Sequence, residues 1–147
     1  MQNFPLVSVI CLSYNHEAYV VEALNSVINQ TYPNIELLIA DDCSSDNSIG
    51  VIKDWVKNHP EVHFSTNEKN LGNTKTFNQL AKIAKGEFII DLAADDLLVP
   101  NCIEKQVTTF QNSKYKNLGI VYGNLIEIDK NGNFLNNYYN EEDRPES

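Results

Sequence analysis

The fold of this chain is decided by IELLIADD, residues 35–42, an apolar run of strand length that ends in Asp41 and Asp42. The same pattern returns in EFIIDLAADD, residues 87–96, which ends in Asp95 and Asp96. Each run is typical of a buried β-strand that opens into an acidic loop. In one parallel sheet both acidic pairs would lie at the carboxyl edge, where open α/β sheets bind ligands.

Apolar runs and helical periodicities alternate along the rest of the chain. Strands are expected at 7–12, 35–40, 62–65, 87–94 and 119–128, the last folding back through the turn at 129–133 onto 134–135. Helices are expected at 17–30, between a cap at Ser45 or Asp46 and Pro60, from Phe77 to Gly86, and from Asn101 to Phe110. Gly86 is expected to close its helix in a left-handed conformation. This alternation predicts an α/β fold with a mostly parallel sheet and helices on both faces.

Composition limits the class of protein. The 147 residues, 42% of them hydrophobic, can bury the core of one domain. A net charge of −9 argues against a nucleic-acid partner. Without a membrane-length apolar run or a signal segment, we expect a cytoplasmic protein, at most peripheral to the inner face of a membrane. Three cysteines without metal-knuckle spacing are expected to be reduced.

The second acidic pair is a candidate metal site. Asp95 and Asp96 offer hard oxygen ligands on a loop, which suit Mg²⁺ or Mn²⁺ shared with substrate phosphates. An isolated Asp-Asp pair more often caps a helix or solvates a turn, so the pair alone is weak support.

The first acidic pair and three other residues are candidates for nucleotide binding. Asp41 and Asp42 stand where dinucleotide folds hydrogen-bond a base or a ribose, although Ser45 or Asp46 beside them also suits a helix cap. Tyr14 offers an aromatic face and Asn15 an amide at the end of the first strand. Lys75 could approach a phosphate, yet a lone lysine on a helix is usually solvated.

Four groups of residues together resemble the family 2 glycosyltransferases. They are VSVI (7–10) with Tyr14 and Asn15, ELLIADD (36–42) with SSD (44–46), NLG (70–72), and KGEFI (85–89) with Asp95 and Asp96. The resemblance covers about residues 6–128, and the ordered combination is far more specific than any single motif.

The resemblance implies a Rossmann-like GT-A fold and a nucleotide-diphosphate sugar as donor, with UDP the first expectation. Tyr14 and Asp42 match residues that hold the nucleobase, and Asn15 and Asp41 lie close by. Asp96 matches the carboxylate that contacts Mn²⁺ or Mg²⁺. Asp95 shares that site and matches the carboxylate that faces the ribose or the sugar.

Three departures from the family pattern concern the site. Cys43 stands where the family usually has glycine, and Leu12 replaces the more usual proline or threonine. Phe77-Asn78 replaces an Arg-Asn pair, which leaves Lys75 as the candidate basic contact.

The resemblance also predicts the domain organisation. Residues 1–137 are expected to form the donor-binding domain and 138–147 a polar tail. The acceptor-binding region and the catalytic base are expected to lie outside this chain. The polar-tail carboxylates Glu141, Glu142 and Asp143 are therefore not assigned as the base.

The expected reaction is metal-dependent attack of an acceptor hydroxyl on the anomeric carbon, with inversion. The acceptor is expected to be a saccharide or a lipid-linked saccharide. One alternative is a nucleotide-binding module without catalysis, or an inactive fragment. Another is a phosphoacceptor signalling domain, but that class needs its acidic pair after the first strand, where this chain has Tyr14 and Asn15.

Overall fold

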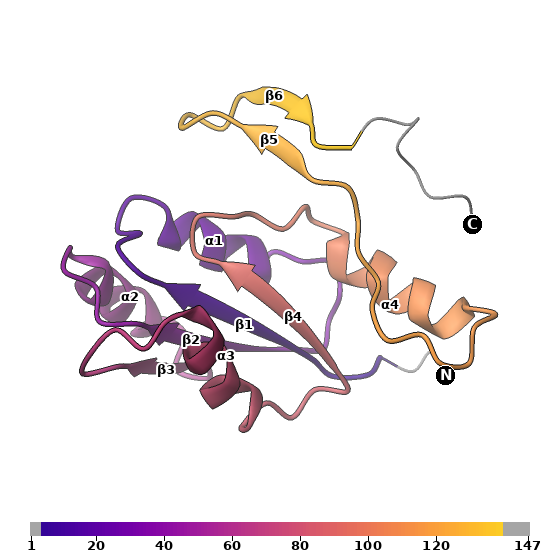
Figure 1. Ribbon diagram of the computed structural model, residues 1–147, viewed down its shortest axis with the longest axis horizontal. Helices are drawn as coiled ribbons and strands as arrows, with labels where there is room; N and C mark the ends of the chain where they lie inside the picture. The colour runs from indigo at the N-terminus through magenta and orange to yellow at the C-terminus, as the bar shows by residue number, and fades with distance from the viewer. Residues whose placement is uncertain (1–3, 140–147) are drawn as a thin grey trace. The chain divides into compact units, whose positions relative to one another are not determined.

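The computed structural model describes residues 4–139 and divides the chain into two compact units, residues 1–105 and 106–147 (Figure 1). The first unit contains β1 (Val7–Ser13), α1 (Val20–Ile28), β2 (Ile35–Asp41), α2 (Ser48–Val56), β3 (His63–Thr66), α3 (Asn73–Ala81) and β4 (Phe88–Ala93). Helix α4 (Cys102–Asn112) crosses the division, and β5 (Ile126–Ile128) and β6 (Phe134–Asn137) follow in the second unit.

The four strands of the first unit form one parallel sheet in the order β3-β2-β1-β4. Strand β1 lies at the centre, with Val7 opposite Ile35 on one side and Phe88 on the other. Every residue of β1 is buried, and its sequence, VSVICLS, contains no charged residue, as expected of a strand covered on both faces. The predicted α/β class with a mostly parallel sheet is confirmed.

Helices cover both faces of this sheet (Figure 1). On one face Leu80 of α3 packs into a cluster with Ile10, Leu12, Leu38 and Ala40. Side chains alternate along a strand, so Val9, Cys11 and Ile39 point to the opposite face, where α1 and α2 contact the sheet and each other. The helical stripes expected from the sequence therefore face the core, although α1 and α2 are shorter than predicted and α3 begins and ends earlier than predicted.

At the amino edge of the sheet, Glu36 ties three segments together. Its Oε1 accepts hydrogen bonds from the Ser8 hydroxyl and from the backbone N–H groups of Lys85 and Gly86. Burial alone would raise the pKa of Glu36, but these hydrogen bonds outweigh it, and the pKa is lowered.

Gly86 corrects one prediction. Helix α3 ends at Ala81, and φ of Gly86 is not positive, so Gly86 is not a left-handed helix cap. A Cβ at Gly86 would instead lie 2.5 Å from the backbone nitrogen of Ser8. Glycine is needed there for close approach to β1, because any side chain would clash with main-chain atoms.

The second unit contains an antiparallel hairpin of β5 and β6 around the turn at Asp129, as the turn residues predicted. The long strand expected at 119–128 is wrong, because β5 comprises only Ile126–Ile128. Gly119 and Gly123 weaken a strand, and β6 offers only four residues as a partner. The boundary before residue 138 stays a prediction, and residues 140–147 lie outside the described chain.

Candidate functional site

The parallel sheet gathers the predicted site residues of the first unit at its carboxyl edge. Strands β2 and β4 both pair with β1, so Asp42 and Asp95 follow strands only two inter-strand spacings apart, roughly 10 Å. Tyr14 follows β1 between them and is 45% exposed. Residues distant in sequence thus share one edge, which is where such sheets bind ligands.

Asp42 is almost fully buried and organises the loop before α3. Its Oδ1 accepts hydrogen bonds from the Leu71 N–H and the Asn67 amide, both at 2.8 Å, and its Oδ2 accepts one from the Gly72 N–H at 2.7 Å. Burial alone would raise the pKa of Asp42, but the bonds from Leu71, Asn67 and Gly72 lower it below its usual value. The ionised carboxylate therefore holds the loop in place.

Asp41 has no exposed surface, and both its oxygens bind Ser44. The Ser44 N–H donates to Oδ1 at 2.8 Å and the Ser44 hydroxyl to Oδ2 at 2.6 Å. A nucleotide contact by Asp41 stays a prediction. Because Asp41 is buried and bound to Ser44, its carboxylate shapes the turn at residues 41–44. Cys43 between them has φ of 66°, the left-handed region in which the family's usual glycine is unstrained.

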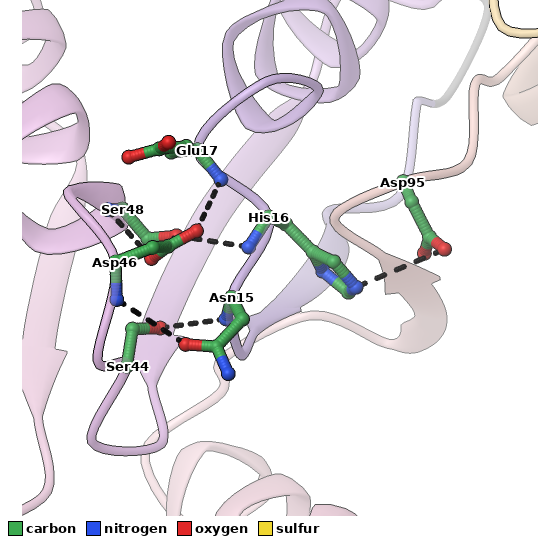
Figure 2. A network of polar contacts seen from close by, with 7 residues as sticks. All are labelled: Asn15, His16, Glu17, Ser44, Asp46, Ser48 and Asp95. Carbon is green, nitrogen blue, oxygen red and sulfur yellow. Dashed lines mark hydrogen bonds and ion pairs between the residues drawn. The ribbon is translucent and has the colours of Figure 1, made fainter.

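Asn15 joins the loop after β1 to the loop after β2 (Figure 2). Its side-chain Oδ1 accepts hydrogen bonds from the Ser45 N–H at 2.8 Å and the Ser45 hydroxyl at 3.2 Å, while its own N–H donates to the Ser44 hydroxyl. The expected ligand contact of Asn15 is untested. The structure adds a scaffolding role, which adjacent strand ends in a parallel sheet make possible.

Asp46 completes this junction. Its Oδ2 accepts the Glu17 N–H at 3.0 Å, while Glu17 Oε2 accepts the Asn47 N–H at 2.7 Å, so each loop caps the other. Asp46 Oδ1 also accepts the Ser48 N–H at the start of α2, but the cap predicted at Ser45 or Asp46 is wrong in position. Asn47 occupies the cap position itself and makes no side-chain capping bond.

The second acidic pair has a different environment. Asp95 and Asp96 are both exposed. Partial burial of its carboxyl group, and then the like charge of Asp95, raise the pKa of Asp96 above its usual value. This residual repulsion is what a bound cation would relieve, so the donor set fits a hard divalent metal.

His16 is the residue of this site that the sequence did not reveal. Its Nε2 lies 3.8 Å from Asp95 Oδ2, and Figure 2 shows the ring directed at that carboxylate. Its backbone N–H is fixed by the Ser48 hydroxyl at 2.9 Å. No sequence pattern pointed to His16, because no other His or Cys stands near it at metal-ligand spacing and Asp95, which it contacts, is almost 80 positions away.

No group of three or more His, Cys, Asp or Glu residues within the described part of the chain could hold a metal by itself. A cation at Asp95 and Asp96 would therefore need further oxygens from a ligand, as diphosphates supply. Lys75 is exposed in the first turn of α3, three residues after Gly72, which contacts Asp42. That places a positive charge on the same side of the first unit as the acidic loops.

Comparison with known proteins identifies the family. The sequence profile of "Glycosyl transferase family 2" matches residues 8–145, nearly the whole chain. The chain belongs to glycosyl transferase family 2. The resemblance inferred from the four groups of motifs is thereby confirmed.

Curated relatives within family 2 are longer than this chain. Chondroitin synthase from Escherichia coli is 34% identical over 140 residues, 95% of this chain and 20% of that protein. The E. coli protein WfgD, a UDP-Glc:alpha-D-GlcNAc-diphosphoundecaprenol beta-1,3-glucosyltransferase, is 36% identical over 126 residues, 86% of this chain and 48% of that protein. The chain thus spans about one fifth of the first of these two relatives and about half of the second.

Solved structures of the same architecture include TarS from S. aureus, which matches with a TM-score of 0.64 at 30% identity over 72% of this chain and 19% of that chain. TarS 1–349 in complex with UDP matches with a TM-score of 0.65 at 26% identity over 80% of this chain and 38% of that one. These neighbours confirm the predicted GT-A class. Among the described residues, no helix combines the length and the apolar character needed to cross a membrane.

Proposed function

We propose that this family 2 chain supplies the donor-binding part of a metal-dependent, inverting glycosyltransferase. The reaction moves a sugar from a nucleotide-diphosphate sugar to an acceptor hydroxyl. One observation carries the proposal: the exposed pair Asp95 and Asp96, with the pKa of Asp96 raised by partial burial and by its neighbour, shares a sheet edge with Tyr14 and Asp42.

The nucleotide would occupy the part of the edge beyond β1 and β2. Tyr14, 45% exposed, offers a ring face on which a base can stack. Asp42 stands at the end of β2 on this edge, and its pKa is held low, despite burial, by hydrogen bonds from Leu71, Asn67, Gly72 and Thr76, so it offers an ionised acceptor to a base N–H. UDP is the proposed nucleotide, supported by the relative WfgD, whose name carries UDP-Glc, and by the complexes of TarS 1–349 with UDP and with UDP-GlcNAc.

The diphosphate would lie toward β4. Asp96 would hold Mn²⁺ or Mg²⁺, with Asp95 sharing the cation or facing the donor ribose or sugar, and Lys75 would approach a phosphate. A divalent cation bound there supplies Lewis-acid stabilisation of the charge that develops on the leaving diphosphate. Asn15 keeps the loops after β1 and β2 in register, so that Tyr14 and Asp42 meet the same ligand.

The acceptor, proposed to be a saccharide or a lipid-linked saccharide, must be deprotonated by a general base as it attacks. No described residue is assigned this role, and Glu141, Glu142 and Asp143 lie outside the described residues. The expected cytoplasmic location stays a prediction.

Calorimetric titration with UDP, dTDP and GDP, in Mn²⁺ and in chelator, tests the proposal. We expect one nucleotide, UDP, to bind in a metal-dependent manner, and we expect Asp96→Ala to weaken this binding at least about tenfold. Equal affinity of the unaltered chain in Mn²⁺ and in chelator would refute the metal role.

A further inference from the structure

The loop that carries the acidic pair is fastened to the C-terminal end of α1 by one side chain, Gln30. Its Nε2 donates to the Val99 carbonyl at 2.8 Å and to the Ser26 carbonyl at 3.0 Å. Its Oε1 accepts the Ile103 N–H at 3.1 Å. One amide therefore links α1 to both the end of the acidic loop and the first turn of α4.

Two neighbours of Gln30 extend this connection. The Ser26 hydroxyl accepts the Leu98 N–H at 3.1 Å, and the Thr31 N–H donates to the Pro100 carbonyl at 2.8 Å. The Thr31 hydroxyl donates to Glu104 at 2.7 Å. Backbone groups at three successive positions, 98 to 100, are thus bound by residues of one short segment, 26–31.

On the other side of the acidic pair, the loop is fixed by the sheet. The Ala94 N–H continues the strand ladder to the Leu12 carbonyl at 3.0 Å, and the Asp96 N–H closes a turn onto the Ala93 carbonyl. Asp95, Asp96 and Leu97 are the residues between these two anchors. Their own side chains are exposed, so the conformation of this short span depends on its ends.

We propose that Gln30 is a positioning residue for the metal site, acting through Val99 and Ile103 on the acidic pair; this rests on the function proposed above. Two like-charged carboxylates drift apart on a free loop, and holding them for a cation has an entropic cost of order 1 kcal/mol or more for each residue that must be ordered. A loop ordered before binding avoids that cost. Gln30 suits this role because an amide offers a donor and an acceptor together, which no charged side chain does.

Gln30→Met tests the proposal, since methionine keeps the length of the side chain but removes both hydrogen bonds. Gln79→Met, on the exposed surface of α3, is the matched control for the same chemical change. Ser26→Ala is a milder second variant, because it removes the acceptor for the Leu98 N–H but leaves the Gln30 contacts in place; it also removes the bond from Ser26 Oγ to the Ala23 carbonyl within α1, a loss that the higher helix propensity of alanine offsets. Amide hydrogen exchange at Leu98 and Ile103, UDP affinity in Mn²⁺ and in chelator, and thermal unfolding are measured for all four proteins.

We expect exchange at Leu98 and Ile103 to accelerate in Gln30→Met while strand β1 remains protected. UDP affinity in Mn²⁺ should fall about tenfold, affinity in chelator should change less than about twofold, and Ser26→Ala should lose about threefold in Mn²⁺. Gln79→Met should match the unaltered chain.

Two results would overturn the positioning role. One is an unchanged ratio of affinities in Mn²⁺ and in chelator in Gln30→Met, because a merely structural glutamine lowers the unfolding temperature without touching that ratio. The other is unchanged exchange at Leu98 and Ile103. Absence of metal-dependent UDP binding in the unaltered chain is a different failure, since it refutes the proposed function itself and the inference with it.

Discussion

The two acidic pairs of this chain look alike in sequence and differ in almost every physical respect. Asp41 and Asp42 are buried, and their four oxygens accept hydrogen bonds from Ser44 and from the loop 67–72. Asp95 and Asp96 are exposed, and the imidazole of His16 lies beside them, with Nε2 at 3.8 Å from Asp95 Oδ2.

This contrast shows how a protein divides one residue type between two tasks. Where N–H groups converge on a carboxylate, the charged form is stabilised, and the pKa of Asp42 is lowered. Where a carboxylate is partly buried beside another carboxylate, the charged form is disfavoured, and the pKa of Asp96 is raised. The first pair therefore builds the site, and the second is free to bind a cation.

The largest expected effect is on stability, from Asp42→Asn. Asparagine carries no charge and replaces one acceptor oxygen with an NH₂ group, which cannot accept the Gly72 N–H and leaves it only its longer bond, 3.0 Å, to Asn70 Oδ1. We expect a loss of about 2–3 kcal/mol of unfolding free energy at pH 7, measured by urea denaturation. A loss below about 0.5 kcal/mol would show that the loop 67–72 does not depend on this carboxylate.

The same variant has a defined pH dependence. Because the pKa of Asp42 is lowered on folding from an ordinary value of 3.8, its ionised form contributes stability that is fully present above that value. The contribution is lost as the pH falls further, through the lowered value of the folded chain. The gap between the unaltered protein and Asp42→Asn should therefore be constant from pH 7 to about 5 and close below about pH 4.

Smaller effects on stability, of opposite sign, are expected at Cys43 and Asn15, two residues with positive φ in the loops around the first acidic pair. Cys43 and Asn15 have φ of 66° and 60°, a conformation that costs most L-residues about 1 kcal/mol. Cys43→Gly relieves that strain and loses only a weak contact of Sγ with the Glu68 carbonyl, at 3.6 Å. We expect it to stabilise the chain by about 0.5 kcal/mol, the remainder being offset by the entropy of glycine in the unfolded state.

Asn15→Gly is the matched comparison for Cys43→Gly. The two residues have similar positive φ, but the Asn15 side chain accepts hydrogen bonds from the neighbouring loop. Removing Oδ1 leaves the Ser45 N–H without its acceptor, so we expect a loss of about 1 kcal/mol. Urea denaturation of both variants measures the difference. The same sign in both would mean that backbone strain, and not the Asn15 side chain, governs this junction.

Periodicity and strand ends were enough to predict the framework of the site. The sheet, the helix faces and the meeting of Asp42 with Asp95 at one edge all arise from apolar runs that stop at carboxylates. The sequence could not distinguish the two pairs, because the donors to Asp42 come from residues 67 to 72 and the tether Gln30 reaches Val99. Such contacts depend on how loops cross in space, and no local pattern encodes them.

The strand predicted at 119–128 is longer than the observed strand β5, Ile126–Ile128, for a related reason. An apolar run predicts a strand only where a partner is available, and β6 pairs with three residues of it, Ile126–Ile128. The Leu125 carbonyl still accepts the Tyr138 N–H, but the side chain of Asn124 accepts the N–H groups of Leu125 and Tyr139, so from Asn124 a side-chain amide takes the place of the backbone ladder. Partner availability is a property of the whole fold and not of the run itself.

The smallest expected change in stability is at the second acidic pair, and it is the most direct test of the difference between the two pairs. Asp96→Asn removes one of two carboxylate charges that repel each other. The pKa of Asp96 is raised, and no hydrogen bond contributes to that shift, so the substitution removes no bond that stabilises the charged form. The free energy of unfolding should therefore rise slightly or stay within about 0.5 kcal/mol of its unaltered value. The same substitution should still weaken metal-dependent UDP binding, because an amide oxygen is a poorer ligand for a hard cation than a carboxylate. Urea denaturation in chelator measures the first effect and calorimetry in Mn²⁺ the second. A loss of stability above about 1 kcal/mol would mean that Asp96, like Asp42, builds the loop that carries it.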